Sequence, residues 1–347
     1  MQNGDSDTGG YRPAVLLPAA LAGARRVVLT AHLNPDPDAL GCALGLSHIL
    51  AREGWEAVPV CIGNVPSFAD ALPGFDRLVR FPSSLEPGAA ADRILRPGDA
   101  LVVADTPTPS RMAAFYDVHA EMMRDCPVVV FDHHITNEQY GTTNYVDTGA
   151  AASAEVVCDV LEASGLALDM PSATCFMAAL LADTQTFRTE STSPRSLLWG
   201  YRLASLGAPI FPIAQMLFKT RPVVGVKLWG AALHDVQARD DVLWTTVTQD
   251  MLRAAGATME EAEGLVDFLL ASLGTRVAIV LKEEDSGETK VSMRTVPGVD
   301  ATRIVGAFGG GGHQRAAGCT IEAPPEAAAK LLLPRVFDEV KAGAAVA

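Results

Sequence analysis

The run of residues 128–131 most constrains the fold, because it is wholly apolar and ends directly in Asp132, His133 and His134. A short β-branched run of this kind predicts a buried strand whose carboxyl end presents ligand-binding side chains. Three other apolar runs lead to similar residues: 27–30 precedes His32, 101–104 precedes Asp105, and 173–182 precedes Asp183. Four segments that end in Asp or His predict a hydrolytic centre with two metal ions.

The first part of the chain alternates strand and helix signals. Apolar runs at 27–30, 57–61, 101–104 and 128–131 predict strands that are buried on both faces, which is typical of a parallel sheet covered by helices. Residues 39–53 have helical periodicity. Ser153, Ser172 and Ser193 are the expected N-caps of three later helices. The predicted fold class is therefore α/β, with a doubly wound, mainly parallel sheet over residues 1–210 that follows a flexible tail, 1–12.

A second, smaller α/β domain is expected at 236–347, across a cleft from the first, with residues 211–235 as a partly helical linker. The segments 242–247, 277–281 and 290–294 predict strands, and residues 259–273 predict a helix. The glycine run 309–312 is expected to form a loop that enters a helix.

The composition excludes some functions. A net charge of −14 over 347 residues argues against a protein that coats long duplex DNA, which needs dense Lys and Arg. The six cysteines form no C-x-x-C pair, so we expect reduced thiols in a cytoplasmic protein. No apolar run reaches the roughly 18 residues of a membrane span, and the polar N-terminus lacks the basic start of a signal peptide.

His32, Asp36 and Asp38 lie where a strand is expected to pass into a helix. Two carboxylates two residues apart can be directed by a turn toward different cations, and His32 adds a nitrogen ligand. Gly41 and Gly45 in the following helix would allow close backbone approach. The alternative is a helix N-terminus with acidic capping residues, which is about equally common.

The later acids and histidines have competing interpretations. Asp105 alone could be a turn residue, but it could also bridge both metal ions. Two consecutive histidines, His133 and His134, on a strand would face opposite ways, so that one can bind metal while the other faces substrate, and Asp132 could hold a ring N–H. Asp183 follows an apolar run, where a bare carboxylate is costly unless it is paired or metal-bound. Its alternative is a helix C-terminal Asp that faces water.

The glycine run carries a second candidate site. Backbone N–H groups of such a loop can bind an anion, and Arg315 just beyond it adds positive charge. Ser292 and Arg294 on the preceding strand could bind the same phosphate or base. Glycines alone would more often indicate a flexible loop.

Taken together, these motifs resemble those of a known family. The segment 32–41 with Asp105, residues 132–134 and Asp183 resembles the four motifs of the DHH phosphoesterase superfamily. Residues 292–294 and 308–313 resemble its DHHA1 domain, and nearly the whole chain, from about residue 27 to residue 318, is similar to the NrnA type. Cys42 and Thr295 depart from the serines that are usual at these positions, and neither is a metal ligand.

The resemblance implies a two-manganese site, with Mg²⁺ or Co²⁺ as alternatives. One ion would be held by His32, Asp36 and Asp105, and the other by Asp38, Asp105, His133 and Asp183. The catalytic residues would be His134, Asp132 and Asp105, with His134 at the scissile phosphate or its leaving group. The substrate would be bound by Ser292, Arg294, Gly310, Gly311, Gly312, His313 and Arg315.

The implied activity is hydrolysis of very short RNA and linear dinucleotides to mononucleotides, and of 3′-phosphoadenosine 5′-phosphate to AMP. A homodimer is expected, with no membrane and no long duplex as partner. A cyclic-di-AMP phosphodiesterase is an alternative that the sequence does not separate. A RecJ-like exonuclease would need further binding modules and a basic groove, and a DHH pyrophosphatase has another type of second domain. A non-catalytic nucleotide sensor is a minor alternative, because all expected ligands are present.

Overall fold

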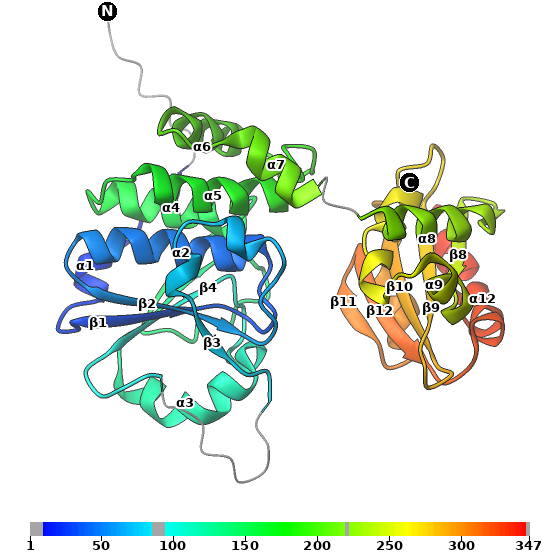
Figure 1. The fold of residues 1–347 in the computed structure, drawn as a ribbon, viewed down its shortest axis with the longest axis horizontal. Coiled ribbons are helices and arrows are strands. Elements are labelled where there is room, and N and C mark those ends of the chain that lie inside the picture. Colours follow the sequence, from blue (N-terminus) through cyan, green and yellow to red (C-terminus); the bar gives the residue numbers. More distant parts are fainter. Residues whose placement is uncertain (1–9, 85–93, 219–221, 345–347) are drawn as a thin grey trace, which may run out of the picture. The chain divides into compact units, whose positions relative to one another are not determined.

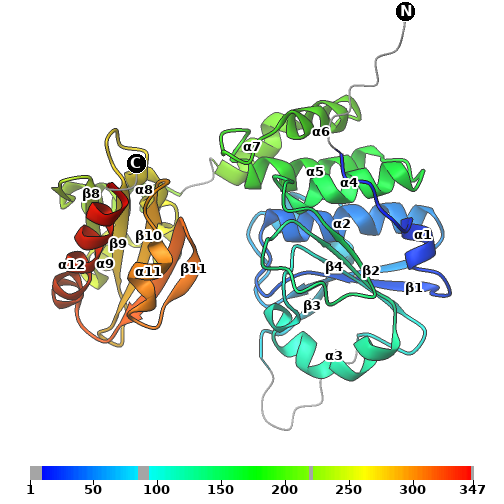
Figure 2. The same ribbon diagram turned by 180° about the vertical axis from the view of Figure 1, so that it is seen from behind.

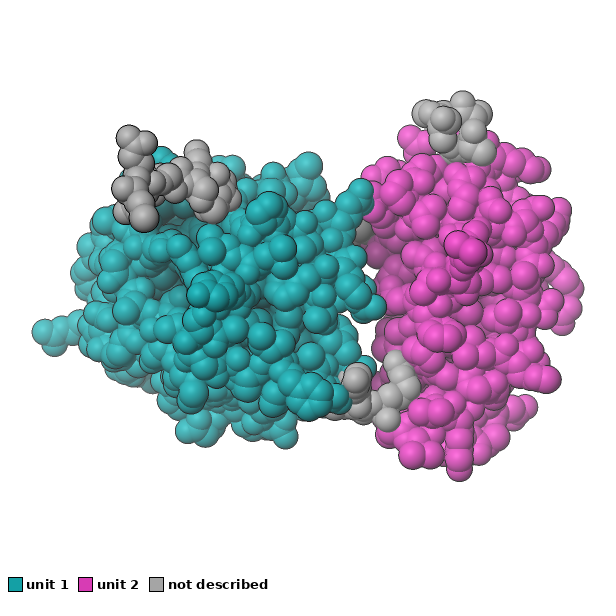
Figure 3. Space-filling model, turned by 90° about the horizontal axis from the view of Figure 1, so that it is seen from above, with its two compact units in different colours: residues 1–220 teal, residues 221–347 magenta. Residues whose placement is uncertain are grey.

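The computed structural model describes residues 10–84, 94–218 and 222–344. The chain divides into two compact units, Met1–Thr220 and Arg221–Ala347, which Figure 3 distinguishes by colour. Each unit has its own sheet with a hydrophobic core on each face, so each is described by itself.

The first unit is built on a parallel sheet. Within the described residues its six strands follow the order β3-β2-β1-β4-β5-β6, and every neighbouring pair is parallel. The order reverses between β1 and β4, and at such a reversal the loops that follow the strands diverge and leave a crevice. The predicted doubly wound parallel sheet is thus confirmed. The strands are β1 (Arg26–Thr30), β2 (Glu56–Ile62), β3 (Val79–Phe81), β4 (Ala100–Ala104), β5 (Val128–Asp132) and β6 (Thr143–Val146).

Helices cover both faces of this sheet (Figure 1). Alternate residues of β1 explain why: Val27 and Leu29 pack into one hydrophobic core and Val28 into another. The helices α2, α4 and α5 lie over the first face with α6 and α7 outside them, and α3 lies over the second (Figures 1 and 2). Their bounds are α1 (Leu17–Ala20), α2 (Pro37–Arg52), α3 (Ala114–Asp125), α4 (Ser153–Ala163), α5 (Met170–Asp183), α6 (Pro194–Ser205) and α7 (Ile210–Phe218).

Helices α2 and α5 pack closely because α2 lacks side chains at the contact. A Cβ atom added to Gly41 would lie 2.6 Å from the carbonyl oxygen of Cys175, and one added to Gly45 would collide with the ring of Phe176. The close backbone approach expected at these glycines is confirmed. It places the N-terminus of α2 near the C-terminus of α5, where Asp183 is the last residue.

The helix starts agree in part with the prediction. Ser193 caps α6, followed by proline at the first helical position, as predicted. Ser172 was expected to cap α5, but Asp169 is the cap and Ser172 is the third residue of a capping box with it. Ser153 was expected to cap α4, but it lies inside the first turn and its hydroxyl donates to Asp105.

The second unit has a mixed sheet with helices on both faces, the smaller α/β domain that was expected. Its strand order is β11-β12-β10-β9-β8-β7, in which β8 and β9 are parallel and the other neighbouring pairs are antiparallel. On β9, Ile279 packs into the core under α11 and α12, and Val280 packs into the core under α8, α9 and α10. The strands are β7 (Gln237–Arg239), β8 (Val242–Val247), β9 (Val277–Glu283), β10 (Thr289–Thr295), β11 (Gly311–His313) and β12 (Ala316–Ile321). The helices are α8 (Val223–His234), α9 (Gln249–Ala255), α10 (Leu265–Leu270), α11 (Ala301–Gly306) and α12 (Pro325–Ala344).

Two predictions for this unit are wrong. The expected helix 259–273 is a 3₁₀ turn, Met259–Ala262, followed by the short α10, because Gly264 between them is left-handed with φ of 81°. The glycine run does not enter a helix: Gly311–His313 is an edge strand in a hairpin with β12. A Cβ atom at Gly312 would lie 2.5 Å from the carbonyl oxygen of Ala316, and one at Gly310 would collide with Gly318, so these two glycines serve close strand approach.

The segment 211–235, predicted as a partly helical linker, is largely helical over its described residues. Helix α7 contributes Ile213 to the main core of the first unit, and α8 contributes Leu228 and Ala232 to a core of the second. Within the described ranges, no helix has the length and apolar character needed to cross a lipid bilayer.

A candidate metal centre at the carboxyl edge of the parallel sheet

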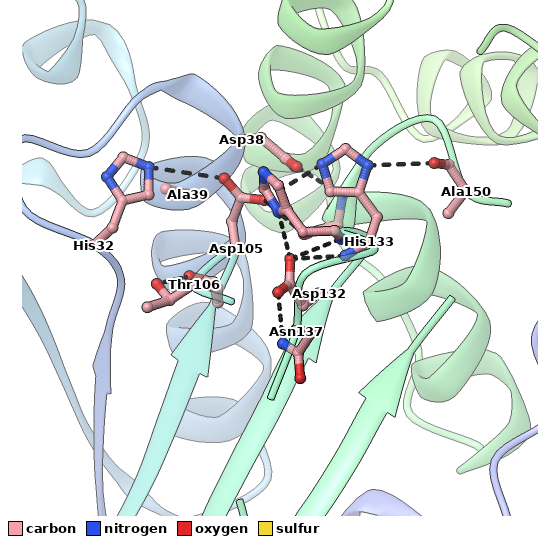
Figure 4. A network of polar contacts seen from close by, with 12 residues as sticks. His32, Asp38, Ala39, Asp105, Thr106, Asp132, His133, Asn137 and Ala150 are labelled. Carbon is pink, nitrogen blue, oxygen red and sulfur yellow. Dashed lines mark hydrogen bonds and ion pairs between the residues drawn. The ribbon is translucent and has the colours of Figure 1, made fainter. Parts of the chain in front are cut away.

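Neighbouring strands deliver the candidate ligands to one place. His32 follows β1, Asp105 follows β4 and His133 follows β5, all at the carboxyl edge where the strand order reverses (Figure 4). Asp38 comes from the first turn of α2, and Asp183 ends α5. This edge of a doubly wound sheet is where such folds bind ligands.

Asp105 lies at the middle of the group. Its Oδ2 atom is 3.7 Å from Nε2 of His32, and its Oδ1 atom is 3.5 Å from both Nε2 of His133 and Nδ1 of His134. The residue is 3% exposed and has a left-handed backbone with φ of 50°, which Asp tolerates better than most residues. One carboxylate therefore faces histidines on two sides.

The ligand atoms form overlapping groups. One potential ligand atom from each of His32, Asp36 and Asp105 lies within 4.8 Å of the others, and the same holds for Asp38, His133 and Asp183. Nε2 of His133 is 3.4 Å from Oδ2 of Asp183. The structure thus brings together all the residues that the sequence predicts as metal ligands, in two groups with Asp105 adjoining both. A third such group contains Asp105, His133 and His134.

The electrostatics of these carboxylates fit a bound cation. Burial, with the negative charges of Asp105 and Asp36, raises the pKa of Asp38 well above its usual range. Burial and Asp36 likewise raise the pKa of Asp105, and burial with Asp38 and Asp105 raises the pKa of Asp183. Carboxylates that repel one another in a buried place are costly without compensating positive charge, and divalent cations supply it.

Two histidines are oriented for metal binding by backbone carbonyls. Nδ1 of His133 lies 3.2 Å from the carbonyl oxygen of Ala150, and Nδ1 of His32 lies 2.9 Å from that of Leu33. A carbonyl only accepts, so each Nδ1 carries the hydrogen and each Nε2 presents a lone pair to the carboxylates. This arrangement is typical of metal-binding histidines.

His134 is held by a different partner. Its Nδ1 atom donates to Oδ1 of Asp132 at 2.7 Å, and Oδ2 of Asp132 accepts from Asn137 at 2.6 Å. Burial alone would lower the pKa of His134, but the hydrogen bond with Asp132 and the charge of Asp105 raise it. The expectation that the two histidines face opposite ways along a strand is wrong, because β5 ends at Asp132 and both rings reach Asp105.

Some site residues were missed from the sequence. The hydroxyl of Ser153 donates to Asp105 at 2.9 Å, and its backbone N–H donates to Asp38 at 2.6 Å. Asn137 and the carbonyl of Ala150 were also missed. The thiol of Cys42 contacts Asp38 at 3.5 Å. The sequence signal for Ser153 is a serine at an expected helix start, which predicts a cap and not a contact with Asp105.

The second unit contains a cavity of about 600 Å³ on the open face of β10 and β12. Ser292 and Arg294 alternate along β10, so both face it, and Gly310 and Gly311 line it as well. Gly312 and Arg315, also predicted to bind substrate, are not among the lining residues, and the side chain of His313 lies outside the described part of the chain. Nε of Arg294 lies 2.9 Å from Oδ1 of Asp267 on α10. Lys290, Gly318 and Thr320 also line the cavity.

Thr295 departs from the usual serine without facing this cavity. Its hydroxyl lies 2.9 Å from the carbonyl oxygen of Val299 and 3.3 Å from that of Gln314, and it is buried. Thr295 therefore holds together the segment that follows β10 and the turn between β11 and β12.

Comparison with known proteins identifies both units. The model of the DHH family, N-terminal domain, matches residues 26–182, and that of the DHHA1 domain matches residues 242–342. The chain is 31% identical to the bifunctional oligoribonuclease and PAP phosphatase NrnA of Thermus thermophilus, over 85% of this chain and 84% of that protein. It is 26% identical to the protein of the same name from Bacillus subtilis, over 87% and 91%.

Two further similarities concern a rival activity and the fold. The chain is 25% identical to the cyclic-di-AMP phosphodiesterase GdpP of Geobacillus thermodenitrificans, over 84% of this chain but 44% of that protein. A crystal structure of an exopolyphosphatase-related protein from Bacteroides fragilis superposes with a TM-score of 0.83 at 21% identity, over 91% of this chain and 92% of the other.

Proposed function

The chain belongs to the DHH family and carries a DHHA1 domain, and from this premise we propose that it is a phosphoesterase that uses two bound metal ions. Its proposed substrates are very short RNA and linear dinucleotides, which it cleaves to mononucleotides, and 3′-phosphoadenosine 5′-phosphate, which it converts to AMP. The observation that carries the proposal is the convergence of carboxylates and imidazoles around Asp105. The names of the relatives with 31% and 26% identity support the substrate classes.

The donor set suits Mn²⁺, with Mg²⁺ and Co²⁺ as alternatives, because carboxylate and imidazole ligands favour such ions over soft thiolate-binding metals. We propose that His32, Asp36 and Asp105 hold one ion, and that Asp38, Asp105, His133 and Asp183 hold the other. When bound, the ions supply an activated water and stabilise negative charge on the phosphoryl oxygens.

Asp132, His134 and Ser153 lie outside the proposed ligand set, and we propose that they transfer a proton and orient a ligand. Because Asp132 keeps the proton on Nδ1 of His134, the Nε2 atom is the nitrogen that can deliver a proton to the leaving oxygen. The hydroxyl of Ser153 fixes the carboxylate of Asp105. The raised pKa of His134 favours the protonated imidazole that such a donor needs, the hydrogen bond with Asp132 outweighing burial.

We propose that the cavity of the second unit binds the nucleotide. Arg294 can pair with a phosphate, Ser292 can donate a hydroxyl hydrogen bond, and the backbone of Gly310 and Gly311 can approach the ligand closely. Gly312, His313 and Arg315 remain proposed contacts.

A cyclic-di-AMP phosphodiesterase is the second candidate, because relatives of that name match over most of this chain. The two activities differ in their substrates, because a linear dinucleotide has free ends and a cyclic dinucleotide has none. Turnover of linear and cyclic diadenylate under the same conditions separates them.

The test is a Mn²⁺-dependent assay on RNA of two to five residues, cyclic di-AMP, phosphoadenosine phosphate and a long single strand. We expect mononucleotides from the dinucleotide, AMP from phosphoadenosine phosphate, and loss of both activities with EDTA. Asp105→Asn is expected to abolish turnover. Full activity in Asp105→Asn, or binding of nucleotides without turnover in added Mn²⁺, would overturn the proposal.

We further propose a cytoplasmic homodimer. All six cysteines are buried free thiols, which suits a reducing compartment. Leu197, Tyr201 and Phe211 on α6 and α7 are 55%, 71% and 71% exposed, an apolar face that suits a protein partner. Light scattering on the purified chain gives the assembly, and a monomer at micromolar concentration would contradict it.

A further inference from the structure

The loop of residues 147–152 connects β6 to α4, and its inner side contacts the proposed metal centre. The carbonyl oxygen of Ala150 lies 3.2 Å from Nδ1 of His133. Just beyond the loop, the first two N–H groups of α4 donate to Asp38 at 2.6 and 3.1 Å. The path of this loop therefore sets the orientation of two proposed ligands from different elements.

Arg195 on α6 holds the same loop from the outside. Its Nη1 atom lies 2.5 Å from Oδ2 of Asp147, where the loop begins. Its Nε atom lies 3.7 Å from Oε2 of Glu155, and its Nη2 atom lies 2.6 Å from Oδ2 of Asp159, both on α4. Arg195 is 5% exposed, so these interactions are little screened by solvent.

Two of the three carboxylates that contact Arg195 also hold the loop backbone. Oδ1 of Asp147 accepts from the N–H of Gly149 at 3.0 Å, and Oε2 of Glu155 accepts from the N–H of Ala151 at 3.2 Å. Burial raises the pKa of Glu155, while the nearby Arg195 charge opposes that rise. The guanidinium thus favours the ionised carboxylate of Glu155, which holds the second end of the loop through the N–H of Ala151.

We propose that Arg195 is a positioning residue of the metal centre: by fixing the loop 147–152 at both ends, it holds the Ala150 carbonyl on His133 and the start of α4 on Asp38. The inference rests on the proposed metal-binding function. Neither Arg195 nor its three carboxylate partners belongs to the proposed ligand set.

Arg202 provides a matched control on the same helix. It forms an ion pair with Glu162 at 2.9 Å and stacks over Trp199, with its guanidinium carbon 4.8 Å from the ring centre. Glu162 lies near the end of α4, away from its first turn. A purely structural role of arginines on α6 would affect thermal stability in both variants, whereas positioning of the ligands would affect metal affinity in one.

The experiment titrates the metal-free full chain with Mn²⁺ and follows free Mn²⁺ by electron paramagnetic resonance. Wild type and Arg202→Lys are expected to bind Mn²⁺ alike. Arg195→Lys keeps the positive charge but replaces the branched guanidinium with a single ammonium group. Asp147→Asn removes the negative charge that pairs with Arg195 at the start of the loop. Both variants are expected to weaken Mn²⁺ binding roughly tenfold or more, as substitutions of residues that orient metal ligands commonly do.

The outcomes separate the two proposals. A wild-type chain that does not bind Mn²⁺ would refute the proposed metal centre itself. Folded Arg195→Lys and Asp147→Asn with the Mn²⁺ affinity of Arg202→Lys would overturn the role of Arg195. If Arg195→Lys does not fold, Asp147→Asn decides, because Asp147 is partly exposed and its variant leaves the buried guanidinium with two carboxylates. Recovery of kcat in the variants at high Mn²⁺ would support weakened binding as the cause.

Discussion

Nδ1 of His134 donates a hydrogen bond to Oδ1 of Asp132 at 2.7 Å. Burial would raise the pKa of Asp132, but the hydrogen bonds from His134 and Asn137 outweigh it and the pKa is lowered, so the acid is ionised near neutral pH. An ionised carboxylate only accepts, which assigns the proton to Nδ1 and leaves Nε2 for chemistry.

Asp132→Asn is therefore expected to reduce kcat by about 10²-fold or more, the usual contribution of a general acid or base. The amide can donate to Nδ1 and favour the wrong tautomer of His134. The affinity for Mn²⁺ should change little, because Asp132 lies outside the proposed ligand set. Glu138→Gln, which changes an exposed acid in the loop after β5, is the control and should keep the wild-type kcat. An unaltered kcat in Asp132→Asn would exclude the role of this pair.

Gly41→Ala is expected to lower stability and metal affinity together. The added methyl would lie 2.6 Å from the carbonyl oxygen of Cys175 and push α5 away from α2, at a cost of about 1–3 kcal/mol. Asp38 and Asp183 lie on these two helices, so their separation should grow. Gly230→Ala, in the interior of α8 with open space around it, should instead stabilise by up to about 1 kcal/mol. Thermal unfolding and Mn²⁺ titration measure both effects, and equal unfolding temperatures for the two variants would count against the close packing.

The parallel sheet and the place of the candidate site could be predicted because both depend on local patterns. Apolar runs such as 128–131 indicate strands buried on both faces, and the residues after parallel strands must meet at one edge. The hairpin of β11 was missed because its glycines are explained by contact with Ala316 and Gly318, which the local sequence does not reveal.

The residues that orient the proposed metal ligands could not be predicted from the sequence for a similar reason. Ser153 and Arg195 act through partners that are distant in sequence: Ser153 contacts Asp105, and Arg195 contacts Asp147. Residue type and spacing identify groups that can bind a cation, but the partners that orient those groups depend on how helices pack.

Arg294→Met is expected to raise KM by about tenfold or more, since a charge-assisted hydrogen bond to phosphate contributes about 1.5–3 kcal/mol. The Mn²⁺ affinity should stay unchanged, because Arg294 lies in the second unit and the proposed ligands lie in the first. Lys330→Met on α12 is the control: Lys330 is 74% exposed and pairs with Glu326. Steady-state kinetics on a dinucleotide tests this, and a wild-type KM in Arg294→Met would remove Arg294 from the proposed substrate contacts.

Removal of the metal ions is expected to make stability fall as the pH rises. In the metal-free protein, burial raises the pKa values of Asp38, Asp105 and Asp183 above the roughly 3.9 of an unfolded Asp. Above the unfolded value the folded state then holds more protons than the unfolded state, so the free energy of unfolding declines until the raised values are passed. The raised pKa of His134, whose hydrogen bond with Asp132 outweighs burial, acts in the same direction.

Bound Mn²⁺ favours the ionised carboxylates and should cancel this decline. In EDTA the unfolding temperature should therefore be lower at pH 7.5 than at pH 5, and with Mn²⁺ the drop should become smaller, leaving the part due to groups outside the metal centre such as Glu155, whose pKa is raised by burial. Asp183→Asn removes one of the repelling charges, so its drop in EDTA should be smaller than that of the wild type. Asp36 and Asp132, whose pKa values are lowered by their hydrogen bonds despite burial, complete their titration below this window and add no slope. A metal-free protein whose unfolding temperature stays level or rises from pH 5 to 7.5 would show that the carboxylates are neutralised by something other than a metal ion.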